Sequence, residues 1–170
     1  ANRYVDPFVQ KSLLDYEQLH GKEISFNNLN DLYGAVALVR EFGDVTVTAA
    51  IKHSTPCGVA IGENGYDSYM KAYEADPQSI FGGIVAVNYK VDEATAIEMN
   101  KIFLEIVAAP DFDDAALEVL KQKKNLRILK LTNLQANEAK YDIKYLEGKV
   151  LVQHLIHHLK MGIHLMVGIM

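Results

Sequence analysis

Short apolar runs alternate along most of this chain with segments in which apolar residues recur at helical spacing. The run Ile84–Val87 has the length and composition of a strand buried on both faces, and residues 126–131 alternate between apolar and polar in the manner of a strand. The alternation predicts an α/β domain with a mainly parallel sheet and helices on its faces. The predicted helices span 12–19, 32–42, 66–75, 92–106 and 113–124, and a further short strand is predicted at 107–110.

The stretch 45–60, VTVTAAIKHSTPCGVA, places two ionisable side chains at the end of a predicted strand. Residues 45–51 have strand composition, and the turn residues of 54–58, STPCG, are expected to lead the chain out of the sheet. Lys52 and His53 then stand at the carboxyl end of a strand, where ligands bind in open α/β sheets. A cation beside a proton-transfer group predicts a site there, and two solvated loop residues are the alternative.

Composition limits which cellular compartment and which classes of partner are expected. The net charge of -5 and the pI of about 5.7 give no general attraction to nucleic acid or to an anionic membrane, so neither is expected as a partner. Cys57 is the only cysteine, which excludes an intramolecular disulfide. The N-terminus lacks the apolar core of a signal peptide, and no run has the length of a membrane span. We therefore expect a cytoplasmic protein.

Four ordered motifs carry a resemblance to a known family. They are GKEISFNNLNDL at 21–32, IKHSTPCGVA at 51–60, YMKAYEADPQSIFGGIVAVN at 69–88 and FLEIVAAPDFDDAALEVLKQKKNLRIL at 103–129. Together they resemble the AICAR transformylase part of the bifunctional AICAR transformylase/IMP cyclohydrolase of purine biosynthesis. The resemblance implies a three-layer αβα, cytidine-deaminase-like lobe and an active site completed across a homodimer. It divides the chain into an irregular arm at 1–20, a first transformylase lobe at 21–153 and a divergent apolar, His-rich tail at 154–170.

The resemblance also implies a reaction, the transfer of formyl from 10-formyltetrahydrofolate to the 5-amino group of AICAR. That amine is a poor nucleophile, so its attack needs a base to remove the proton as the bond forms. His53 matches the family position of this base, and Lys52 matches the residue that stabilises the oxyanion. The implied substrate-binding positions are Arg3, Tyr4, Asn28, Gly82, Gly83 and Glu105. From the residues alone, Gly82-Gly83 fits a bend into the strand as well as a close approach to a ligand.

The chain departs from the family pattern in three places. Residues 5–9, VDPFV, alter the motif that follows the Arg3-Tyr4 pair, and Ser54-Thr55 replaces the usual Thr-Asn. The chain stops at Met170, before the second lobe of the family. The tail from His154 onward no longer resembles the family, as expected of a frameshifted or truncated reading frame. The alternative to an active enzyme is therefore a non-catalytic homologue that binds a purine nucleotide or only dimerises.

Several other residues could be interpreted as metal-binding, catalytic or ligand-binding, but the sequence favours simpler structural roles for them. His154 and His158 are spaced as metal ligands on a helix, but no carboxylate accompanies them, so a packed amphipathic helix is favoured. A zinc deaminase would need a Pro-Cys-x-x-Cys motif, which this chain lacks. Cys57 is interpreted as a small apolar filler. The tyrosines at one helix face are interpreted as packing residues: Tyr66, Tyr69 and Tyr73. A basic cluster is interpreted as a solvated helix end, with a folate or phosphate contact as its alternative: Lys121, Lys123, Lys124 and Arg127.

Overall fold

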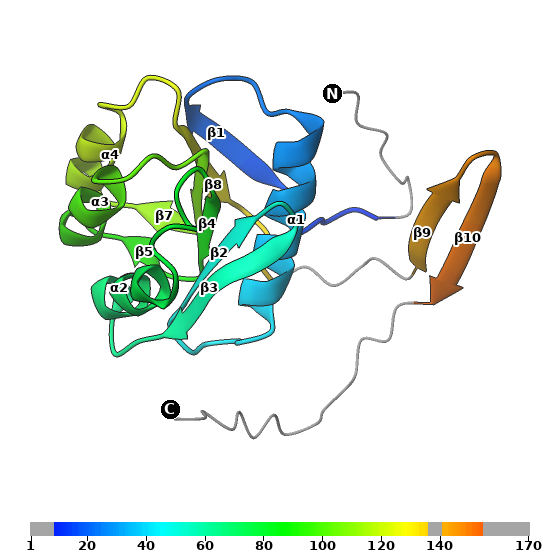
Figure 1. Ribbon diagram of the computed structural model, residues 1–170, viewed down its shortest axis with the longest axis horizontal. Coiled ribbons are helices and arrows are strands. Elements are labelled where there is room, and N and C mark those ends of the chain that lie inside the picture. The colour runs from blue at the N-terminus through cyan, green and yellow to red at the C-terminus, as the bar shows by residue number, and fades with distance from the viewer. Residues whose placement is uncertain (1–8, 136–140, 155–170) are drawn as a thin grey trace.

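A six-stranded sheet forms the centre of the computed structural model, which describes residues 9–135 and 141–154 (Figure 1). The strand order is β1-β8-β6-β4-β2-β3, so the chain crosses over between non-adjacent strands. The strands span Tyr16–His20 (β1), Val47–Lys52 (β2), Thr55–Ile61 (β3), Ile84–Val87 (β4), Ile106–Ala109 (β6) and Arg127–Leu131 (β8).

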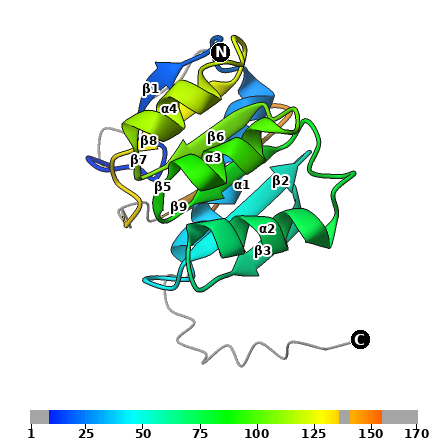
Figure 2. The same cartoon turned by 90° about the vertical axis from the view of Figure 1, so that its left-hand side faces the viewer.

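Helices cover both faces of this sheet. One face is covered by α1 (Phe26–Arg40), and the other by α2 (Gly65–Ala75), α3 (Glu93–Asn100) and α4 (Asp114–Leu120). Figure 2 shows α2, α3 and α4 side by side in front of the sheet, with α1 behind it. The expected three-layer αβα arrangement is confirmed.

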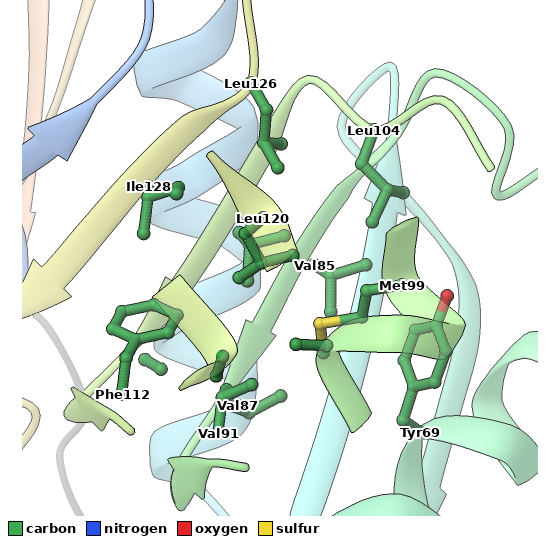
Figure 3. Packing of buried hydrophobic residues seen from close by; sticks show 14 of the residues in the cluster. Tyr69, Val85, Val87, Val91, Met99, Leu104, Phe112, Leu120, Leu126 and Ile128 are labelled. Atoms are coloured by element: carbon green, nitrogen blue, oxygen red, sulfur yellow. The ribbon is translucent and has the colours of Figure 1, made fainter. Parts of the chain in front are cut away.

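Each face of the sheet has its own apolar core. On the α1 side, Leu32 and Val36 of the helix pack with Ile51 and Ile106 of the strands. On the other side, Tyr69, Met99 and Leu120 come from the three helices and meet sheet residues such as Val85 and Ile128 (Figure 3). Alternate residues of each strand enter opposite cores, as the two-residue period of a strand requires.

The sheet is mixed, and the expectation of a mainly parallel sheet is wrong. β4 runs parallel to β6, and β6 to β8. The other three neighbouring pairs, β1 with β8, β2 with β3 and β2 with β4, are antiparallel. Two segments differ from the prediction: residues 55–58 of STPCG begin β3, and residues 16–19 of the helix predicted at 12–19 belong to the edge strand β1.

Side-chain caps mark the starts of α1 and α3. Asp92 caps α3 at the predicted start of that helix, its side chain accepting from the backbone N–H of Thr95 at 2.8 Å. The helix ends at Asn100 rather than near 106, because Ile106 already belongs to β6. Ser25 caps α1, which begins at Phe26 rather than at the predicted 32. The predicted helix at 113–124 is shorter and ends at Leu120.

Two small two-stranded sheets lie outside the central one. β5 (Lys90–Val91) pairs with β7 (Asp111–Phe112), and β9 (Tyr141–Leu146) pairs with β10 (Lys149–His154). Every residue of β9 and β10 is exposed, and the hairpin lies to the right of the sheet in Figure 1. One of its faces is largely apolar, with Ile143 opposite Val152 and Tyr145 opposite Val150. His158 and most of the predicted tail lie outside the described residues.

Candidate functional site

Lys52 and His53 stand where β2 turns back into β3. Lys52 pairs with Thr55, so only His53 and Ser54 form the loop. Their φ angles are 54° and 63°, the left-handed values that a two-residue type I′ turn requires at both positions. Glycine or asparagine usually occupies such positions, and a histidine there is strained. The turn leaves His53 exposed and Lys52 half-buried.

A clasp from α1 holds this strained turn. The Asp31 carboxylate accepts from the backbone N–H of Ser54 at 2.8 Å and from its hydroxyl at 2.9 Å. The Asn30 side-chain amide donates to the same hydroxyl at 2.6 Å. The polar first turns of α1 therefore fix the conformation of the residue next to His53.

The ammonium group of Lys52 is directed toward the Gly82 loop. Its Nζ donates to the carbonyl oxygen of Phe81 at 2.7 Å. Gly82 has a φ of 74°, and its N–H donates to the carbonyl of Phe103 at 2.7 Å. A Cβ built on Gly83 would lie 3.0 Å from two carbonyl oxygens, those of Ile51 and Ile80. Both glycines are therefore explained by the bend into β4 and by close backbone packing.

The strand register brings three of the predicted site residues to one edge of the sheet. Ile51 of β2 lies opposite Ile84 of β4, and Ile84 lies opposite Ile106 of β6. Lys52, Gly83 and Glu105 are the neighbours of these three residues in the chain, so they lie side by side at that edge. Because β2 is antiparallel to β4, this edge carries the amino ends of the parallel strands. Lys52 and His53 do lie at the carboxyl end of their own strand, β2, as expected, but that strand runs opposite to the parallel strands beside it.

Glu105 is joined to a buried arginine of the next strand. Arg127 Nη1 lies 2.6 Å from Glu105 Oε2, and Arg127 Nε donates to the carbonyl of Glu23 at 2.9 Å. The side chain of Arg127 is 9% exposed and that of Glu105 is 35% exposed. Arg127 is therefore part of the strand edge, and its expected place in a solvated helix end is wrong. A charge opening an alternating strand was the sequence signal for this position.

Asn28 is the other predicted substrate-binding residue that the structure describes, and its contacts lie within the cap of α1. Asn28 is the third residue of α1, and its Oδ1 accepts from the Ser25 hydroxyl at 2.9 Å in the helix cap. No hydrogen bond in the described part of the chain links Asn28 to the Lys52-His53 turn. Arg3 and Tyr4 lie outside the described residues.

An open cavity of about 680 Å³ adjoins the turn. Its lining comes from the end of β2, from β3 and from the segment after α2: Lys52, His53, Thr55, Pro56, Cys57, Ala75, Asp76, Gln78 and Ser79. Burial raises the pKa of the Cys57 thiol, and its Sγ contacts the Ala50 carbonyl at 3.5 Å. A protonated thiol is a poor nucleophile, which supports the interpretation of Cys57 as a filler.

Residues 9–135 and 141–154 contain no cluster of three or more His, Cys, Asp or Glu side chains placed to hold a metal ion. None of the helices in these ranges is long and apolar enough to cross a membrane.

Solved structures show only distant likeness. The dCMP deaminase of cyanophage S-TIM5 superposes on 61% of this chain, and 99% of its own, with a TM-score of 0.45 and 10% identity. Acinetobacter baumannii RibD superposes on 59% of this chain, and 35% of its own, with a TM-score of 0.44 and 14% identity. Likeness at this level carries no argument about fold or chemistry.

Sequence comparison gives a much closer match. The bifunctional purine biosynthesis protein PurH of Clostridioides difficile is 53% identical over 152 residues, which is 88% of this chain and 30% of the relative. PurH of Thermoanaerobacter is 56% identical over 150 residues, covering 88% and 29%, and PurH of Bacillus cereus is 50% identical over 154 residues, covering 90% and 30%. The chain thus spans about 30% of the length of these relatives. The family model described as the AICARFT/IMPCHase bienzyme matches residues 1–163, and the chain therefore belongs to that family.

Proposed function

We propose that this chain contributes to the transfer of formyl from 10-formyltetrahydrofolate to the 5-amino group of AICAR. The observation that carries the proposal is the juxtaposition of a cation, a histidine and a carboxylate at one edge of the sheet. Lys52 and His53 line one open cavity, and the strand register places Glu105 two strands from Lys52. Family membership supplies the reaction. On the same family grounds we propose a cytidine-deaminase-like lobe over 21–153 between the arm and the tail, with β1 of the arm added to its sheet.

His53 is assigned the general base. The imidazole is exposed at the tip of the hairpin, where it can meet the amine of a bound nucleotide and pass its proton to solvent. The clasp on Ser54 limits how far the turn can move, so the base is presented in one backbone conformation.

Lys52 is assigned the electrostatic role. When the amine attacks the formyl carbon, negative charge develops on the formyl oxygen, and an ammonium group near it lowers the barrier. The hydrogen bond from Lys52 to the Phe81 carbonyl fixes the cation beside Gly82 before the substrate arrives. A preplaced charge costs no reorganisation during the reaction.

The nucleotide is assigned to the surface beside these residues. Glu105 is half-buried and can accept an N–H from the AICAR carboxamide, next to the backbone of Gly82 and Gly83. Asn28, Arg3 and Tyr4 are assigned to the same nucleotide on family grounds.

The site is open to solvent, which supports its contact with the surface of a partner chain. The same openness is compatible with a second function. Phe81 and Phe103 are 54% and 41% exposed beside Gly82, with ring centroids 5.7 Å apart. Apolar rings at a site usually become covered when the site is complete. We therefore propose a homodimer, with the apolar face of the β9–β10 hairpin available for association. The second candidate is a non-catalytic homologue that binds a purine nucleotide or only dimerises.

Substitution of the pair tests the proposal. Lys52→Ala and His53→Ala should each abolish formyl transfer while leaving the circular dichroism spectrum unchanged, because neither side chain is part of the core. Lys71→Ala, which removes an exposed lysine of α2, is the control and should keep the wild-type rate. Near-normal turnover in either variant would remove that residue from the mechanism.

A further inference from the structure

We propose that Arg127 is a positioning residue that orients Glu105 to recognise a carboxamide in preference to a carboxylate. The inference rests on the proposed function, since it concerns how the nucleotide at that edge is selected. It adds to the site a residue from β8.

The guanidinium group of Arg127 is fixed at two points. Its Nε donates to the carbonyl of Glu23, in the loop that precedes α1, and its Nη1 lies 2.6 Å from Glu105 Oε2. The backbone N–H of Arg127 also donates to the Glu105 carbonyl at 3.2 Å. A planar guanidinium held in this way allows the carboxylate few orientations.

Arg127 and Glu105 differ in exposure, and this difference indicates that their ion pair does more than anchor the two strands. The side chain of Arg127 is 9% exposed and that of Glu105 is 35% exposed. The salt bridge occupies Oε2, and no hydrogen bond to Oε1 is found within residues 9–135 and 141–154. Arg127 therefore lies behind the site and Glu105 in front of it, with one oriented oxygen left to accept.

Glu105 is also tied to the loop that Lys52 contacts. Its backbone N–H donates to the carbonyl of Gly83 at 2.9 Å, and Lys52 Nζ donates to the carbonyl of Phe81 in the same loop. The oriented oxygen thus belongs to a continuous set of contacts that includes the proposed oxyanion-stabilising residue.

The chemistry of an oriented carboxylate oxygen defines the ligand group that it accepts. The oxygen can take an N–H from a carboxamide, whereas a carboxylate in the same place would bring two negative charges together. An aminoimidazole ribonucleotide that carries a 4-carboxylate should therefore bind more weakly than AICAR, by about tenfold or more.

The test compares two nucleotides across four forms of the full chain by calorimetric titration. Arg127→Gln should raise the dissociation constant for AICAR about tenfold, roughly the loss of one charge-assisted hydrogen bond, and should leave that for the 4-carboxylate analogue nearly unchanged. Glu105→Gln should bind the two nucleotides about equally, and Arg127→Gln added to Glu105→Gln should cause no further loss of AICAR affinity, because the two residues act as a unit.

Two further variants keep the test decisive. If Arg127→Gln does not fold, Arg127→Lys replaces it, since a single ammonium group cannot reach both Glu23 and Glu105 with the geometry of the guanidinium fork. Lys130→Gln is the matched control, because it removes a 2.7 Å ion pair with Asp111 near the other end of β8 and should not change either affinity.

The outcomes separate this inference from the function on which it rests. Wild-type affinity in a folded Arg127 variant, or full additivity with Glu105→Gln, would overturn the role of Arg127 and leave the proposed function standing. Absence of AICAR binding by the wild-type chain would overturn both.

Discussion

The strained turn at His53-Ser54 should depend on Asp31 for its stability. Two residues in the left-handed region cost about 1–2 kcal/mol each, and the Asp31 carboxylate offsets part of this through its hydrogen bonds of 2.8 and 2.9 Å to Ser54. A hydrogen bond contributes about 0.5–1.5 kcal/mol net, and these two lie near the surface. Asp31→Ala should therefore lower the free energy of unfolding by about 1–2 kcal/mol, with a fall in Tm of roughly 2–8 °C.

Urea unfolding followed by circular dichroism measures this loss, and two further variants identify its cause. Asp31→Asn keeps an oxygen acceptor without the charge and should lose less than Asp31→Ala. Ser54→Gly relieves the strain and removes the hydroxyl, so Asp31→Ala should cost less in that background than in the wild type. An Asp31→Ala variant as stable as the wild type, or one with the same loss in both backgrounds, would show that Asp31 does not stabilise the strained turn.

Three other predictions follow from the same structure. Gly82→Ala should lower the free energy of unfolding by about 1 kcal/mol or more because of the φ of 74°, and Gly82→Asn should lose less; equal losses in thermal unfolding would contradict this. Gly58→Ala should be far more damaging, since its Cβ would lie 2.2 Å from the Ala72 carbonyl oxygen, and a soluble, native-like variant would count against that packing. Burial raises the pKa of Tyr69 and Tyr89, so the unfolded chain ionises first and stability should fall as pH rises above about 10, with Tyr89→Phe showing a shallower fall in urea unfolding.

Local patterns predicted the elements whose own sequence determines them. Ile84–Val87 is apolar throughout and is a buried strand, and Asp92 begins a helix because its side chain bonds the N–H of Thr95. These features depend on neighbours in the chain, so a single sequence contains them.

Strand pairing was harder to predict from the sequence because it depends on contacts between residues far apart in the chain. The Pro56-Cys57-Gly58 run has turn chemistry, yet it lies in edge strand β3, where Pro56 needs no N–H partner on its open side and Gly58 allows Ala72 of α2 to approach. The direction of β2 against β4 decides which edge carries Lys52, and no local pattern encodes it.

In the candidate site too, features that depend on adjacent residues were predicted, and features that depend on distant contacts were not. Lys52 and His53 were predicted as a pair from adjacent residues, and the structure places them on one cavity. Arg127 was misplaced because its partners, Glu105 and Glu23, are separated from it by 22 and 104 residues. Its position at the sheet edge depends on contacts with residues far away in the sequence, which composition and spacing do not reveal.

Titration of the purified chain with AICAR, followed on the same sample by a formyl-transfer assay with 10-formyltetrahydrofolate, tests whether the edge with Lys52, His53 and Glu105 is a formyl-transfer site. We expect saturable AICAR binding that is accompanied by turnover, and loss of that turnover in His53→Ala. Binding without turnover would contradict catalysis and support a nucleotide-binding homologue. No binding would contradict the assignment of the Lys52, His53 and Glu105 edge as a nucleotide site.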